Sequence, residues 1–140
     1  GTLPADQLVR LCFSGKYTQS QIMNMLAGYG GCQALLGIKD MKEISHRAEA
    51  GEEPYREVLE AMLYTVSKQI GAMAVALWGK AEAIILTGGI AYSKYCVEEI
   101  RKQVEFLAPV VVLPGEGEME SLAFNALGAL NGELPIHEYK

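Results

Sequence analysis

Apolar residues recur at helical spacing through most of the first 80 positions, with the clearest run over residues 53–78. Steps of three and four separate its apolar side chains, which predicts one long helix with a continuous buried stripe. Pro54 stands in its first turn and Gly79 just past its end, as is common at helix termini. The stripe consists of Val58, Leu59, Met62, Leu63, Val66, Ile70, Met73, Ala74 and Leu77.

Shorter apolar segments precede the long helix, and polar residues mark where two of them begin. Thr18 and Gln21 have the spacing of a capping box, in which each side chain binds the backbone of the other residue. Asp40, followed three residues later by a glutamate, indicates a second helix start. The segments are helices over about residues 5–13, 18–28 and 40–51, and a short apolar stretch over 32–36.

The second half of the chain changes to a strand–helix–strand–helix order. Residues 83–86 are all apolar, which is typical of a strand buried on both faces in a parallel sheet. Two strands make a small sheet, so such burial requires neighbouring strands from further sequence or another cover. The pattern predicts strands over 82–87 and 109–113, and helices over 92–105, with Val97, Ile100 and Val104 inward, and over 118–130. The chain is therefore predicted to be a helix-rich α/β protein.

Composition and charge narrow the range of partners. The 140 residues suit one domain or a piece of one, and half of them are apolar. The net charge of −5 comes from 12 basic and 17 acidic residues spread along the chain, without the basic stripe that a nucleic-acid-binding protein needs. No apolar run is long enough for a membrane span. Three scattered cysteines and two histidines argue against zinc or disulfides and favour reduced, buried thiols in the cytoplasm.

Candidate chemistry lies where each predicted strand meets the following helix. Thr87-Gly88-Gly89 ends the first strand, and such a corner lets a ligand approach bare backbone beside the N–H groups of a helix start. The alternative is a plain tight turn that needs a positive φ. After the second strand, Glu116, Glu118 and Glu120 could reach a magnesium ion, or could simply offset the helix dipole.

Other polar residues have mainly structural interpretations. Asp40 suits a helix cap better than a catalytic acid, and Lys42 suits a solvated side chain. His46 is predicted on an exposed helix face, and His137 lies in the terminal segment. The sequence contains neither a dinucleotide fingerprint nor a P-loop, and no nucleophile and base at the spacing of a catalytic pair. We predict no catalytic residue in this chain.

Several segments together resemble the C-terminal part of butyrate kinases, within the acetate and butyrate kinase family of the actin-like ATPase superfamily. The resemblance extends over nearly the whole chain, and its most specific segments are AIILTGGIAYSKY and APVVVLPGEGEMESLAFNALGALNGE. GTLPADQLVRLCFSGKYT, LLGIKDMKEI and the terminal EYK also look like that family. The resemblance implies a helix-rich, partial ribonuclease-H-like domain with a small parallel sheet.

The resemblance further implies a reaction, in which butyrate and ATP give butyryl phosphate and ADP with Mg²⁺. Branched-chain carboxylate kinases are the alternative among enzymes. A carboxylate nucleophile is already ionised at neutral pH, so the reaction depends mainly on alignment and charge neutralisation. By the same resemblance, the site residues are Thr87, Gly88, Gly89 and Ile90 around adenosine, Asp40, Met41 and Lys42 in the adenine and ribose pocket, and Glu116 or Glu118 near the metal.

The same family carries its phosphate-binding loops, its substrate arginine and most of its acyl site before the GTLP segment. We therefore expect residues 1–140 to be a C-terminal nucleotide-binding fragment, inactive alone, whose partner is the missing N-terminal domain. Its helical part would cover about 5–79 and its β-α-β-α part about 80–132. An unpaired sheet edge leads us to expect a homodimer. The alternative from another class is a non-catalytic binding or interaction domain.

Overall fold

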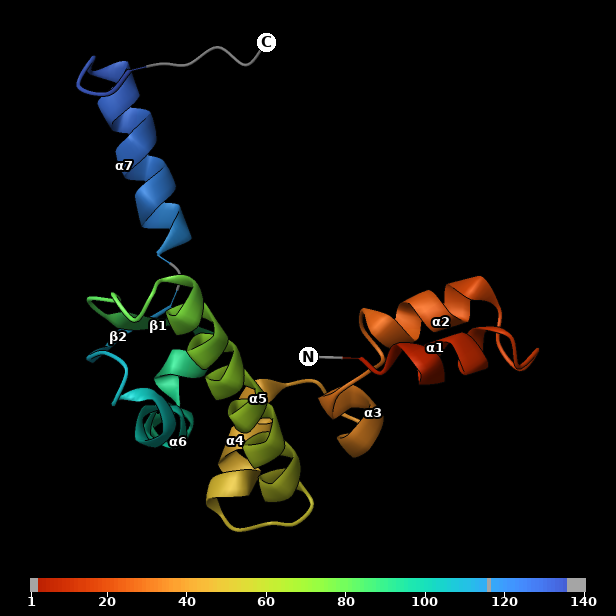
Figure 1. Ribbon diagram of the computed structural model, residues 1–140. Helices are drawn as coiled ribbons and strands as arrows, with labels where there is room; N and C mark the ends of the chain where they lie inside the picture. Colours follow the sequence, from red (N-terminus) through yellow and green to blue (C-terminus); the bar gives the residue numbers. More distant parts are fainter. Residues whose placement is uncertain (1–2, 116, 136–140) are drawn as a thin grey trace.

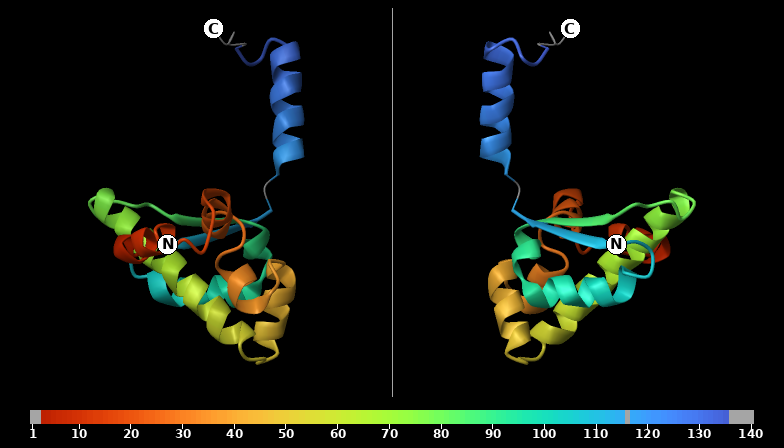
Figure 2. Two further views of the ribbon diagram at one scale, coloured as in Figure 1. Left: turned by 90° about the vertical axis from the view of Figure 1, so that its right-hand side faces the viewer. Right: turned by 90° about the vertical axis from the view of Figure 1, so that its left-hand side faces the viewer.

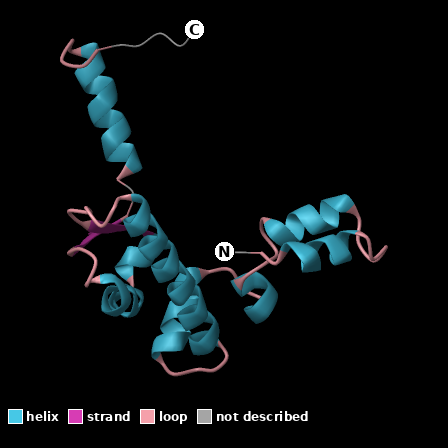
Figure 3. Ribbon diagram, viewed as in Figure 1, coloured by secondary structure: helices cyan, strands magenta, loops and turns pink. Residues whose placement is uncertain are grey.

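A small parallel sheet and a group of helices form the centre of the molecule (Figures 1 and 3). The computed structural model describes residues 3–115 and 117–135. In chain order the elements are α1 (Ala5–Cys12), α2 (Gln19–Leu26), α3 (Cys32–Leu36), α4 (Met41–Glu49), α5 (Tyr55–Ala76), β1 (Ile84–Gly88), the 3₁₀ helix η1 (Gly89–Tyr92), α6 (Lys94–Val104), β2 (Val110–Pro114) and α7 (Glu118–Leu130).

The two strands run parallel, with Ile84 opposite Val110 at one end and Gly88 opposite Pro114 at the other. The connection between them passes through η1 and α6, as parallel pairing requires a crossover. This arrangement confirms the predicted helix-rich α/β class with a small parallel sheet. It also confirms the order of elements after residue 80, although the start of the helix predicted over 92–105 belongs to a separate 3₁₀ turn.

The core lies between the sheet and helices α4, α5 and α6, which occupy one side of it (Figure 2). The inward face of α6 is as predicted, since Val97, Ile100 and Val104 are all buried. Apolar burial of this kind is the main favourable contribution to folding. The largest fully buried side chains are Ile44, Leu59, Leu63, Cys96 and Val104.

The prediction that the strands are buried on both faces is wrong. Leu86 is buried, but its neighbour Ile85 is 60% exposed, and Leu113 on β2 is 56% exposed. Successive strand residues point to opposite faces, and the helices of the core cover only one of them. Helix α7, the next element after β2, extends away from the sheet and leaves its own Leu127 exposed (Figure 1).

The long helix has a shorter buried stripe than predicted. Leu59 and Leu63 are fully buried, and Val66 and Ile70 pack against the same core. Met73, farther along α5, is 57% exposed. The periodicity is continuous, but the end of α5 extends past the elements that cover the rest of the helix (Figure 2). The prediction of one continuous buried stripe is therefore wrong at Met73 and Leu77, although Ala74 between them is buried.

Local polar signals were reliable at the helix starts. Thr18 caps α2 with the predicted capping box: its backbone N–H donates to Gln21 Oε1 over 2.8 Å, and its own Oγ1 accepts from Gln21 N–H over 3.3 Å. The cysteine prediction is only partly correct. All three thiols are free, and Cys96 is buried, but Cys12 is exposed. In the described ranges we find no helix whose length and hydropathy would let it span a bilayer.

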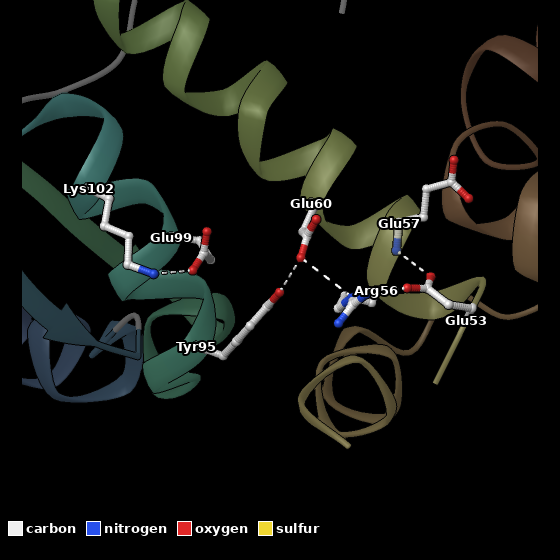
Figure 4. A network of polar contacts seen from close by, with 7 residues as sticks. All are labelled: Glu53, Arg56, Glu57, Glu60, Tyr95, Glu99 and Lys102. Carbon is white, nitrogen blue, oxygen red and sulfur yellow. Dashed lines mark hydrogen bonds and ion pairs between the residues drawn. The ribbon is translucent and has the colours of Figure 1, made fainter. Parts of the chain in front are cut away.

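A polar network links α5 to α6 on the surface of the core (Figure 4). The Tyr95 hydroxyl donates to Glu60 Oε1 over 2.8 Å, and Glu60 also faces Arg56 at 3.9 Å. Burial, followed by the hydrogen bond to Glu60, raises the pKa of Tyr95 to about 12. The folded protein therefore holds the phenolic proton more tightly than the unfolded chain, in which tyrosine titrates with a pKa of about 10.

We expect this proton to make stability depend on alkaline pH. A raised pKa in the folded state stabilises the protein below the unfolded value, and this contribution is lost as the pH rises from about 10 to about 12. Urea unfolding across that window should show a steeper loss of free energy for the unsubstituted chain than for Tyr95→Phe. Tyr92→Phe, at an exposed tyrosine, is the control. Parallel profiles for the unsubstituted chain and Tyr95→Phe would contradict the assignment.

Candidate functional site

The corner between β1 and η1 exposes bare backbone. Gly88 has a φ of 77°, which favours glycine, and Gly89 opens the 3₁₀ helix. The predicted positive φ is thus found at Gly88 and not at Gly89. A Cβ placed on Gly89 would meet no atom within 4 Å. Packing within the protein therefore does not require glycine at position 89, whereas close approach of a ligand would.

The corner after β2 is joined to the first one. Gly88 N–H donates to the Gly115 carbonyl over 3.0 Å, and Gly115 N–H donates to the Gly88 carbonyl over 3.1 Å. Thr87 Oγ1 donates to the same Gly115 carbonyl over 2.8 Å. Gly115 has a φ of 86°, and a Cβ there would lie 2.7 Å from Tyr92 Oη. The two corners that the sequence indicates therefore lie side by side, at the carboxyl ends of the paired strands.

Asp40 caps α4, as its sequence position indicates. Its Oδ1 accepts from Lys42 N–H over 2.9 Å and from Glu43 N–H over 3.5 Å. Asp40 and Lys42 are exposed, while the side chain of Met41 packs against the core. Ile90, from the first corner, packs against this same core. The structure thus places the two predicted groups of ligand residues on one packed unit.

We expect Asp40→Ala to lower the free energy of unfolding by about 1 kcal/mol, because two backbone N–H groups of α4 lose their acceptor. Asp40→Asn should keep nearly all of that stability, since asparagine is an equally good cap. Chemical denaturation followed by circular dichroism measures both. Equal losses for the two variants would show that the charge of Asp40, rather than its capping bonds, stabilises α4.

Of the two glutamates predicted near the metal, the structure describes only Glu118. Glu116 lies outside the described residues. Glu118 is exposed in the first turn of α7, directly after Gly117, whose φ is 57°. The described part of the chain holds no group of three histidine, cysteine or acidic side chains that could bind a metal ion. One carboxylate fits magnesium only if phosphate oxygens and water complete the coordination.

An apolar cavity of about 460 Å³ lies at the other end of the sheet. It is bounded by α5, by residues 81–84 and by Leu107. Ala83 and Ile84 lie at the start of β1, whereas the glycine corner ends it. Its walls are almost wholly apolar and offer no positive charge for phosphates, so this cavity is not a nucleotide site.

Two serines that the sequence patterns did not single out connect the segments that carry the predicted ligand residues. Ser45 lies on α4 and Ser93 precedes α6, and their Oγ atoms are 2.6 Å apart. Ser93 Oγ also accepts from Cys96 N–H over 3.2 Å, which caps α6. Serine just before an apolar helical pattern is a capping signal and could have identified Ser93. Nothing local distinguishes Ser45, because its partner is 48 positions away.

Comparison with known proteins places the chain in a family. The sequence model of the acetokinase family matches residues 10–111, which include α4, the first corner and most of the core. The chain belongs to the acetokinase family. Membership in the acetokinase family implies the actin-like ATPase fold, with which the parallel sheet and its helices agree. Residues 115–118, at the second corner, lie beyond the matched range.

Individual relatives of the acetokinase-family chain carry a more specific name. A probable butyrate kinase of Phocaeicola vulgatus is 62% identical over all 140 residues, which cover 40% of its own length. A probable butyrate kinase of Bacteroides thetaiotaomicron is 51% identical over the same span. One from Clostridium botulinum (strain Alaska E43 / Type E3) is 44% identical over 133 residues, or 95% of this chain and 38% of that protein. The chain thus spans about two fifths of the length of these relatives.

Proposed function

We propose that this chain supplies the nucleotide-binding part of a carboxylate kinase that interconverts butyrate and ATP with butyryl phosphate and ADP. The observation that carries the proposal is the pair of joined glycine corners at the carboxyl ends of β1 and β2. In open α/β sheets this is the edge at which ligands bind. Membership in the acetokinase family and relatives named probable butyrate kinases support the choice of reaction.

The residues of the first corner and of α4 would hold the nucleoside. The open side of Gly89 lets the backbone approach a flat or sugar surface, while Ile90 and Met41 contribute apolar contact from the edge of the core. Both capping bonds of Asp40 end on Oδ1, so Oδ2 is free to accept from a ribose hydroxyl in the described structure. Lys42 is exposed beside it and can face a phosphate.

Magnesium would neutralise charge on the transferring phosphate when bound, and Glu116 or Glu118 would hold it directly or through water. The acyl substrate needs no base from this chain, because its carboxylate is already ionised at neutral pH. Thr87, with its hydroxyl on the Gly115 carbonyl, would keep the two corners in register. The chain therefore binds and orients one reactant, and we propose no catalytic residue within it.

The rest of the protein would supply the phosphate loops and the acyl site. The chain covers 40% of the length of its first relative, and the described part contains no cluster of arginines at either corner. We therefore expect the 140-residue chain alone to be inactive. Its partner would be the N-terminal domain of the same protein. A branched-chain carboxylate is the alternative substrate, since the pocket that selects the acyl chain would lie mostly in the N-terminal domain.

One observation favours a second candidate, an interaction domain without catalytic use of nucleotide. Helix α7 exposes Leu122, Phe124 and Leu130, and β1 has an edge with no strand partner in the described structure. Such surfaces promote association. We propose dimerisation of the isolated chain on this basis, and light scattering after gel filtration measures it. A monomer at high protein concentration would contradict it.

Calorimetric titration with Mg–ADP separates the two candidates. The nucleotide-binding proposal expects saturable binding at micromolar to millimolar concentrations, and competition by ATP. No binding up to several millimolar would favour the interaction domain. A coupled assay for ADP formation should show no butyrate-dependent turnover by the 140-residue chain. Turnover would contradict the proposal that the active centre is incomplete in this chain.

A further inference from the structure

A row of four hydrogen-bonded polar groups, here called the polar row, lies between α4 and the start of α6. Cys96 Sγ lies 3.8 Å from Ser45 Oγ, which lies 2.6 Å from Ser93 Oγ. Ser93 Oγ in turn lies 3.5 Å from Glu49 Oε1. Cys96 is fully buried and Ser45 is 6% exposed, so the inner two groups of the polar row are almost completely shielded from water.

The hydroxyl and thiol protons of the polar row have one arrangement that gives each of them an acceptor. Glu49 is an acceptor when ionised, so the Ser93 hydroxyl donates to it and accepts from Ser45. Ser45 then accepts from the Cys96 thiol, and Ser93 also accepts from Cys96 N–H. Each buried donor then has an acceptor, and the directions of the hydroxyl and thiol bonds follow from the carboxylate at the outer end. Breaking the central bond would leave the buried Ser45 hydroxyl without an acceptor for its proton.

The central bond lies between the two segments that carry the ligand residues. Ser45 is one helical turn after Met41 and therefore lies on the same side of α4. Ser93 directly follows η1, and its N–H donates to the Ile90 carbonyl over 3.1 Å. One short path thus connects Met41 to Ile90 through the two serine hydroxyls. Both segments also contribute apolar side chains to one core, and such packing is less directional than a hydrogen bond.

We propose that Ser45 and Ser93 are positioning residues for nucleotide, whose mutual hydrogen bond sets the separation between helix α4 and the Gly88–Ile90 corner. The inference rests on the proposed nucleotide site at that corner. Neither serine contacts the nucleotide in this arrangement. Their bond keeps the apolar edges of Met41 and Ile90 at the spacing that a base or sugar between them requires, so its loss weakens binding without removing a ligand contact.

Affinity for Mg–ADP gives the first test. Ser45→Ala and Ser93→Ala should each weaken binding about fivefold, the value of one hydrogen bond, and the double variant should be no weaker than the weaker single one. Ser93→Thr, which keeps both hydroxyl and cap, should bind within about twofold of the unsubstituted chain. Ser67→Ala is the control, because Ser67 is a buried serine whose hydroxyl donates to the Leu63 carbonyl of its own helix and to no other described residue. Additive losses, or an equal loss in the control, would overturn the proposal.

Hydrogen exchange separates failure of this inference from failure of the proposed function. The substitution Ser45→Ala lies on α4. The backbone amides of Ser93 and Cys96, at the facing start of α6, should nevertheless exchange about fivefold faster, while the amides of α5 should keep their exchange rates. Exchange that changes only within α4 would overturn the positioning role, whatever the affinities. Absence of Mg–ADP binding by the unsubstituted chain would contradict the nucleotide site and, with it, the role of the serines in positioning that site. Faster exchange at Ser93 would then still establish their mechanical coupling.

Discussion

Leu63→Ala is expected to lower the free energy of unfolding by about 2 to 5 kcal/mol, the largest effect that we predict for one side chain. Leu63 is fully buried in α5 and belongs to the core that α4, α6 and Leu86 complete. Truncation removes apolar contacts and leaves a cavity that the surrounding helices and sheet fill only in part. A loss of this size is a large fraction of the total stability of a domain of this length.

Leu77→Ala is the matched control, because Leu77 has the same chemistry and continues the same periodicity, but is 55% exposed. We expect it to change the free energy of unfolding by less than about 0.5 kcal/mol. Urea unfolding monitored by circular dichroism compares the two. If Leu63→Ala does not fold, Ile44→Val, at another fully buried position, should lose about 1 kcal/mol. Equal losses at Leu63 and Leu77 would contradict a core that ends before Leu77.

Gly89→Val is expected to weaken Mg–ADP binding at least tenfold while leaving the free energy of unfolding nearly unchanged. A Cβ at position 89 meets no protein atom within 4 Å, and the φ of Gly89 lies outside the left-handed region, so the fold tolerates a side chain there. A nucleoside resting on the backbone would be displaced by the isopropyl group. Calorimetric titration and urea unfolding of the same protein preparation measure the two properties together.

The control is Gly71→Val in α5. Gly71 shares with Gly89 an ordinary φ and open space around the position that a Cβ would take, and it lies far along the chain from the corner. This variant should bind Mg–ADP with unchanged affinity, and valine costs no more than glycine in a helix interior. Unchanged binding by Gly89→Val would remove the first corner from the nucleotide site. A large loss of stability in that variant would instead assign Gly89 to the fold.

Local chemistry made several features of this protein predictable. The capping box at Thr18 and the cap at Asp40 follow from side chains that bind backbone within three residues. Helix α7 covers residues 118–130 as predicted, and both strands lie within one or two residues of their predicted bounds. The glycine corner was also evident, since a turn after a strand needs residues that tolerate a positive φ. Each of these depends on interactions between near neighbours in the chain.

Periodicity alone does not imply burial in this protein. Ile85 and Met73 fit apolar patterns as well as Leu86 and Leu63 do, yet the first two are exposed and the last two are buried. A pattern shows which side chains share a face, but another element must cover that face before water is excluded. In the described structure the helices of the core cover one side of the sheet, and the buried side chains of α5 end at Ala74.

The order and type of the elements, their caps and the glycine corners could thus be read from the amino-acid sequence, because they arise from backbone conformation and contacts within a few residues. Long-range packing, by contrast, sets which apolar faces are buried, how Gly88 bonds to Gly115 and how Ser45 meets Ser93. The two polar contacts join residues that are 27 and 48 positions apart, since 115 − 88 is 27. The packing of helices on the sheet selects such partners, and no local preference specifies them.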